Sequence, residues 1–82
     1  MSVVELTEFL IKNLVTDPEN VSVKEMTGED ENQIIIQVVI DEQDMGRVIG
    51  RGGKTANSIR NIVQASSYLK DNKRITINID AI

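Results

Sequence analysis

The residues best suited to chemistry in this sequence lie in one short segment, residues 48–55, which reads Val-Ile-Gly-Arg-Gly-Gly-Lys-Thr. Its three glycines permit positive φ and let the backbone approach a ligand closely. Arg51 and Lys54 add positive charge at the same place. A helix predicted to begin at about Lys54 would point its free amides and the positive end of its dipole toward the glycines. Together these features predict an anion site suited to phosphate.

Two nucleotide-binding patterns come close to this segment without fitting it. The P-loop, G-x-x-x-x-G-K-[ST], would end on Gly53-Lys54-Thr55 but requires glycine where this chain has Val48. The dinucleotide pattern G-x-G-x-x-G, started at Gly50, requires its third glycine at the place of Thr55. The segment is also predicted to follow a short helix and not a strand. A mononucleotide enzyme is therefore disfavoured on two grounds.

Two other classes of protein stay open beside a phosphate-backbone binder. A nucleotide-dependent enzyme would use Gly53-Lys54-Thr55 with the acids Asp41, Glu42 and Asp44, although these acids are better explained as residues at a helix start. A protein-interaction adaptor would use the glycines only to form a tight turn. Three glycines beside two basic residues at the start of a helix are harder to explain in that way.

The composition narrows the choice further. The chain has 82 residues, which suits one domain, and it contains neither cysteine nor histidine. Disulfides, thiolate metal sites and histidine acid–base chemistry are thus excluded, and we expect no metal site, cofactor or catalytic residue. Aromatic residues make up 2% of the chain, which argues against base stacking on exposed rings. The sequence has no apolar run of about 20 residues and no pattern of a signal peptide, so we expect a cytoplasmic protein.

The net charge of −4 is unusual for a protein that binds nucleic acid, but the charges are unevenly distributed. Residues 1–41 carry nine acidic side chains and two basic ones, whereas residues 42–74 carry three acidic and seven basic ones. Between Arg47 and Arg60 there are four basic residues and no acid. Because salt screens charges beyond roughly 8 Å, the local field and not the net charge decides whether a polyanion is attracted.

Hydrophobic periodicity predicts the elements that must hold the loop. Ser2 and Glu5 form a capping-box pattern before a first helix, which we expect to stop at Asp17-Pro18. The remaining elements, in chain order, are strands over residues 21–26 and 34–40, a helix of one or two turns from Asp41, a helix over residues 54–69, and a strand over residues 75–79. The apolar face of the long helix is expected to include Ile59, Ile62, Val63 and Leu69.

The predicted order, α-β-β-α-α-β, fixes an α+β topology. The first two strands should form an antiparallel hairpin, and the helix pair after the second strand makes a crossover that requires the second and third strands to be parallel. We therefore expect one three-stranded mixed sheet with three helices on one face. Alternation along the strands then leaves the opposite face open, lined by Ser22, Lys24, Ile35, Gln37, Val39, Thr76 and Asn78.

The segment Val48-Ile49-Gly50-Arg51-Gly52-Gly53 has apolar residues at its start, a basic residue within it, and predicted helices on both sides. In this setting it resembles the G-x-x-G loop of the KH domain in its prokaryotic, type II arrangement. A lone G-x-x-G is a weak pattern, but these surroundings make it specific. The resemblance covers the whole chain and implies a single KH domain over residues 1–82. One departure is Ala56, where many KH domains carry isoleucine; this change affects the predicted base groove and any sequence preference.

The resemblance implies that the chain binds single-stranded RNA without catalysis, because KH loops clamp the backbone of about four nucleotides. The glycines would permit close approach, Arg51 and Lys54 would pair with phosphates, and Arg47 and Arg60 would extend the phosphate track. Val48 and Ile49 would help to form an apolar floor beneath the bases, although core packing is the commoner role of such residues. The implied RNA-binding residues are Arg47, Val48, Ile49, Gly50, Arg51, Gly52, Gly53, Lys54 and Arg60.

The resemblance also implies partners. Such a protein would act as a post-transcriptional regulator or RNA chaperone, as a homodimer or as a heterodimer with another KH-containing RNA-binding protein. Pairing is physically reasonable because one module that holds a few nucleotides binds weakly, and two linked modules gain avidity. No membrane partner is expected.

Overall fold

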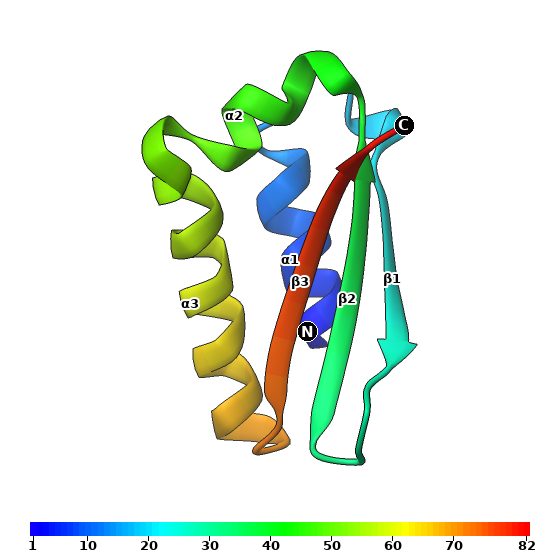
Figure 1. The fold of residues 1–82 in the computed structure, drawn as a ribbon, viewed down its shortest axis with the longest axis vertical. Helices are drawn as coiled ribbons and strands as arrows, with labels where there is room; N and C mark the ends of the chain where they lie inside the picture. The colour runs from blue at the N-terminus through cyan, green and yellow to red at the C-terminus, as the bar shows by residue number, and fades with distance from the viewer.

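A computed structural model describes all 82 residues (Figure 1). The α-helices are α1 (Val3–Lys12), α2 (Met45–Ile49) and α3 (Lys54–Lys70), and the strands are β1 (Ser22–Thr27), β2 (Gln33–Ile40) and β3 (Arg74–Ala81). Three single 3₁₀ turns, η1 (Pro18–Asn20), η2 (Glu42–Asp44) and η3 (Arg51–Gly53), lie between them. The predicted order of helices and strands is confirmed. No helix is both long and apolar enough to cross a bilayer.

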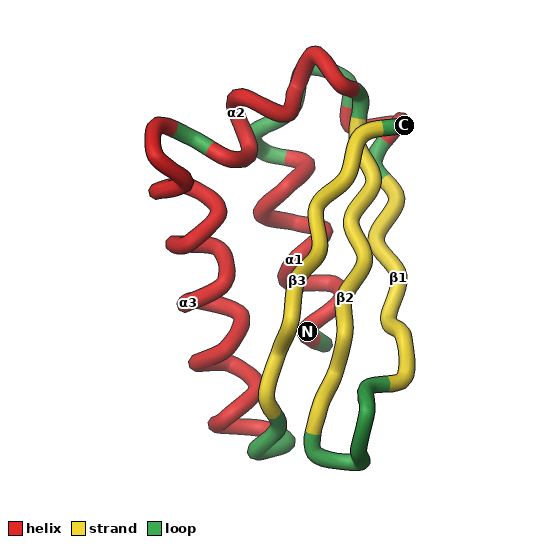
Figure 2. Tube along the Cα trace, viewed as in Figure 1, coloured by secondary structure: helices red, strands yellow, loops and turns green.

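The sheet has the order β1-β2-β3, with β1 antiparallel and β3 parallel to β2 (Figure 2). The register pairs Val23 with Val38, and Val38 in turn with Ile79. Figure 1 shows α1 and α3 running along one side of the sheet, while α2 crosses at the end where β2 finishes. The predicted mixed sheet, with its helices on one face, is therefore confirmed.

Strict alternation along β2 defines the core. Ile34, Ile36, Val38 and Ile40 are buried against the helices, while the residues between them are only partly buried on the open face. This is the expected parity, and the register places the same predicted residues of β1 and β3 on that face. The other buried apolar residues are Val3, Ile11, Val48, Ala56, Ile59, Val63 and Ile77.

The helices differ from the sequence prediction in two respects. Helix α1 ends at Lys12 and not at the proline, because Asn13 caps it by donating from its side-chain amide to the Phe9 carbonyl at 2.7 Å. In α3 the buried face consists of Ala56, Ile59, Val63 and Ser67, whereas two residues expected on the apolar face are exposed, Ile62 by 48% and Leu69 by 88%. The buried residues recur every three or four positions, and at 100° per residue Ile62 and Leu69 lie more than 90° around the helix from the centre of that face.

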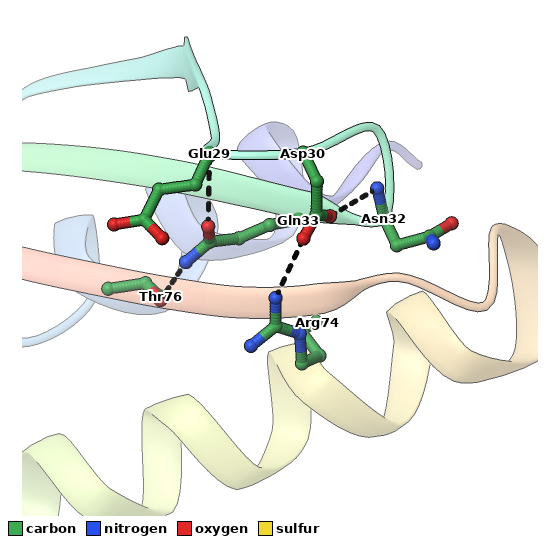
Figure 3. A network of polar contacts seen from close by, with 6 residues as sticks. All are labelled: Glu29, Asp30, Asn32, Gln33, Arg74 and Thr76. Carbon is green, nitrogen blue, oxygen red and sulfur yellow. Dashed lines mark hydrogen bonds and ion pairs between the residues drawn. The ribbon is translucent and has the colours of Figure 1, made fainter.

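A polar network joins the turn between β1 and β2 to the start of β3, at the end of the sheet away from α2 (Figure 3). Arg74 forms an ion pair with Asp30 at 3.3 Å, and its amide donates to the Asn32 carbonyl at 2.8 Å. Gln33 donates to the Thr76 hydroxyl at 3.1 Å. Because Arg74 is held here, it is not a free cation for the glycine loop.

A buried carboxylate fixes the segment that leads into α2. Asp44 is only 1% exposed, and its Oδ1 accepts hydrogen bonds from the amide and the hydroxyl of Thr16, at 3.0 and 2.9 Å. Its Oδ2 is buried without a hydrogen-bond partner. Asp44 was expected to act only as a favourable charge at a helix start, but it connects the segment after α1 to α2 across 28 positions of sequence.

Burial opposes ionisation of Asp44 and by itself would raise the pKa of this carboxyl. The hydrogen bonds from Thr16 lower the pKa, and the Asp17 amide and the Arg47 charge lower it further by smaller amounts. These contributions together outweigh burial, so the pKa of Asp44 is lowered from the ordinary value of 3.8. A carboxylate whose pKa is lower in the folded state stabilises the fold above its unfolded pKa. That stabilisation is lost as the pH falls through the folded value.

We therefore predict that Asp44→Asn lowers the melting temperature by several degrees at neutral pH, because the amide keeps an acceptor oxygen but loses the charge. The gap from the natural protein should begin to shrink as the pH falls below 3.8, the ordinary pKa of an aspartate, and should close as the pH falls through the lowered pKa of Asp44 in the folded state, where this side chain becomes protonated. Thermal unfolding followed by circular dichroism at several pH values measures this. Glu42→Gln, an exposed neighbour, is the matched control; a gap that stays constant with pH would contradict the account.

Candidate nucleic-acid interface

The glycine segment forms a tight turn between the end of α2 and the start of α3 (Figure 1). Gly50 has φ +76°, and a Cβ placed on it would lie 2.3 Å from the Thr55 hydroxyl oxygen and 2.8 Å from the Thr55 amide nitrogen. Both the conformation and the close approach of α3 therefore require glycine at this position. The side chain of Thr55 packs against Gly50, so it is not presented to a ligand as the corresponding residue of a P-loop would be.

Gly52 is at the exposed tip of the turn. It has φ +63°, and no atom would lie within 4 Å of an added Cβ. The turn bonds internally through the Gly53 amide, which donates to the Gly50 carbonyl at 3.2 Å, and through the Lys54 amide, which donates to the Arg51 carbonyl. The amides of Arg51 and Gly52 precede the first of these bonds, so neither of them donates within the 3₁₀ turn.

The predicted cations surround this turn. Arg47, Arg51 and Lys54 are all exposed. Arg47 is 3.9 Å from the Asp44 carboxylate, at the limit of an ion pair, so part of its charge is compensated. Neither Arg51 nor Lys54 has a carboxylate within ion-pair distance. The uncompensated positive charge is therefore centred on Arg51 and Lys54, at the turn itself.

Arg60 faces the sheet. Its guanidinium donates to the Ile77 carbonyl of β3 at 3.3 Å and to the side-chain oxygen of Asn57 at 3.3 Å. Arg60 thus bridges α3 and β3, about 9 Å along the helix from Lys54.

The two apolar residues before the turn have different positions. Val48 is fully buried as part of the same core cluster as Ile59, so it anchors α2 and offers no surface to a ligand. Ile49 is half-buried. No enclosed pocket lies beside the turn.

The acids upstream of the turn are engaged in structural contacts. Asp44 is bonded to Thr16, and the side-chain amide of Asn20 donates to Asp41 at 3.2 Å. They do not gather with other carboxylates into a group that could hold a metal ion. Two of the three acids that favoured a nucleotide-dependent enzyme thus have structural contacts, whereas Glu42 is exposed.

Three contacts around the site were missed from the sequence: those of Thr16 with Asp44, Thr55 with Gly50, and Arg60 with Ile77. Each joins segments whose proximity depends on the tertiary arrangement. Only the contact of Thr55 could have been inferred from the sequence, because Thr55 follows the glycines closely enough to reach Gly50 across the turn.

The sequence profile described as "KhpA/KhpB, KH domain" matches residues 4–79. A relative from Clostridium perfringens, described as "RNA-binding protein KhpA", is 41% identical over 75 residues, which cover 92% of this chain and 96% of the relative. A protein of the same description from Thermotoga maritima is 35% identical, with coverage of 92% and 95%.

Solved structures support the fold independently. The structure of Era from Aquifex aeolicus bound to GDP and AlF4⁻ superimposes with a TM-score of 0.71 at 16% identity, and a structure of Era with MgGDPNP and nucleotides of 16S ribosomal RNA does so with 0.68 at 17%. The match covers 98% and 96% of this chain but only 30% and 29% of the Era chains, so these similarities establish the fold alone. From the profile match and the close relatives, the chain belongs to the KhpA/KhpB KH-domain family.

Proposed function

We propose that this chain binds single-stranded RNA through the turn between α2 and α3 and performs no chemistry on it, with residues 1–82 acting as one KH domain. The observation that carries the proposal is the exposed turn itself, in which Arg51 and Gly52 precede the first internal hydrogen bond and Arg51 and Lys54 have no acidic partner. The descriptions of the relatives as RNA-binding proteins support the class of ligand.

Each part of the turn has a distinct role in this proposal. The amides of Arg51 and Gly52 donate to phosphate oxygens, and the absence of a side chain at Gly52 lets the backbone reach them. The side chains of Arg51 and Lys54 neutralise the phosphate charge, with a weaker contribution from Arg47. Gly50 and Val48 act indirectly: Gly50 allows α3 to approach α2, and Val48 anchors α2 in the core.

We further propose that the protein works in the cytoplasm as a post-transcriptional regulator or RNA chaperone, paired with itself or with another KH-containing RNA-binding protein. A single open surface beside one turn holds few nucleotides, and pairing converts the second contact into an intramolecular one with a high effective concentration. This gain in avidity is the physical reason for expecting a dimer.

We predict that Arg51→Asp combined with Gly52→Asp leaves the fold intact and weakens RNA binding on the order of a hundredfold, because two attractive contacts become repulsive. Aspartate tolerates the positive φ of Gly52 better than most residues, and the space around it is empty. Fluorescence anisotropy with a labelled single-stranded RNA measures the affinity, and circular dichroism checks the fold.

The control for this variant is Lys24→Asp with Thr27→Asp, which makes the same change in charge at two exposed residues of β1. Its affinity should stay close to that of the natural protein. Equal losses in the two variants would mean that net charge, and not the turn, governs binding.

We also predict a steep dependence of affinity on salt. Three cations that neutralise phosphates of a single strand give a slope of about −2 in a plot of log Kobs against log salt concentration. Titrations at four or more concentrations of potassium chloride measure the slope. A flat response would favour the protein-interaction adaptor instead.

Thermal stability distinguishes an RNA-binding protein from a nucleotide-dependent enzyme, because a ligand that binds the folded state raises the melting temperature. We predict that single-stranded RNA at saturating concentration raises the melting temperature of this protein and that Mg²⁺ with ATP leaves it unchanged. Differential scanning fluorimetry with both ligands makes the comparison. A rise with Mg²⁺ and ATP alone would overturn the non-catalytic assignment.

A further inference from the structure

Side chains of α3 form hydrogen bonds with successive backbone groups along the edge of β3 that faces away from β2. Near the start of the strand, Gln64 accepts from the Ile75 amide at 2.8 Å and donates to the Lys73 carbonyl at 2.9 Å, and Ser67 donates to the same carbonyl at 2.8 Å. Arg60, one turn nearer to the glycine turn, continues the series at Ile77. It is the last α3 side chain in this series before the exposed turn.

Arg60 differs from the other two in having several N–H donors left without a partner. A guanidinium carries five N–H groups, and the bonds to Ile77 and Asn57 are made by one group on each of two nitrogens. The residue as a whole is exposed. The bonds to the Ile77 carbonyl and to the Asn57 side chain thus orient its plane and leave three N–H groups for a ligand, so part of the entropic cost of ordering a long side chain has been met in the free protein.

We propose that Arg60 reads a base of the bound strand and is not a further phosphate contact. This inference rests on the proposed function, because it takes the strand to be held by its phosphates at the turn. It also revises the sequence prediction, in which Arg60 extended the phosphate track beside Arg47.

The surroundings of the guanidinium support a base over a phosphate. Two oxygens that carry partial negative charge, the Ile77 carbonyl and the Asn57 side-chain oxygen, already lie against it. The full negative charge of a phosphate at this place would be repelled by both oxygens more strongly than the partial charges on the acceptor atoms of a base. The exposed cations Arg51 and Lys54 offer a phosphate a site without such competition.

The chemistry of the free donors defines the base. A guanidinium fork matches two adjacent acceptors, which guanine presents at O6 and N7, whereas adenine presents an acceptor beside an amino donor. Arg60 should therefore favour guanine over adenine at one position of the strand. A lysine would keep the charge but lose the fork that makes this distinction.

The test compares two RNA octamers, all adenosine and adenosine with a central pair of guanosines, against the natural protein and Arg60→Lys, Arg60→Gln and Asn57→Ala. Affinities are measured by anisotropy across a series of salt concentrations. The natural protein should prefer the guanosine octamer by about tenfold. Arg60→Lys and Arg60→Gln should abolish that preference while the salt slope stays the same, and Asn57→Ala, which removes one of the two tethers, should reduce the preference.

Three results would overturn the inference. The first is no preference for guanosine in the natural protein, and the second is a preference that Arg60→Lys retains in full. The third is an equal loss of affinity for both octamers in Arg60→Gln, with a salt slope reduced by about one, as a phosphate contact requires. Melting temperatures confirm that the variants are folded, and Gln64→Leu controls for loosening of the β3 edge without a change at Arg60. Loss of all RNA binding in the natural protein would instead contradict the proposed function, so the two failures are distinguishable.

Discussion

Parallel pairing of β2 and β3 is the constraint on which the site depends. Two parallel neighbours cannot be joined by a short hairpin, so the chain must cross over the sheet between them, and here it does so through α2, the glycine turn and α3. The reversal from α2 to α3 occurs at Gly50, where the Thr55 side chain lies too close for any other residue. The exposed turn is therefore a consequence of the way the sheet closes its core, and its shape is fixed before any ligand arrives.

Contacts on either side of the turn hold it in that position. On the α2 side, Val48 packs in the core, and Asp44 is held by the two hydrogen bonds from Thr16. On the α3 side, Arg60 and Gln64 fasten the helix to the edge of β3. A turn that is already formed in the free protein loses less conformational entropy when it binds than one that must fold on the ligand, which matters for a module whose contact surface is small. Positive charge is concentrated at the same end because the basic residues follow one another along the crossover, even though the chain as a whole is acidic.

Much of this could be predicted from the sequence because the informative patterns are local. The alternation in β2, the capping box at Ser2 and the glycine spacing each depend on residues close together in the chain, and all three appear in the structure. The missed features depend on distance in sequence. The Asn13 cap ends α1 before the proline, the buried face of α3 is centred on Ala56, Val63 and Ser67 and leaves Ile62 exposed, and Asp44 has its partner 28 positions away. For Arg60, the sequence indicated charge but could not show that the side chain faces β3.

The central claim is that the amides of Arg51 and Gly52 meet the phosphates of a single strand. A titration of ¹⁵N-labelled protein with a short single-stranded RNA, followed by heteronuclear NMR, tests it most directly, since amide shifts respond to new hydrogen bonds. The account predicts that the largest changes fall on Arg51 and Gly52, with smaller ones along the first turns of α3, and that the open face of the sheet is unaffected. Unmoved signals from the turn, with changes centred on β1 or the open face, would contradict it.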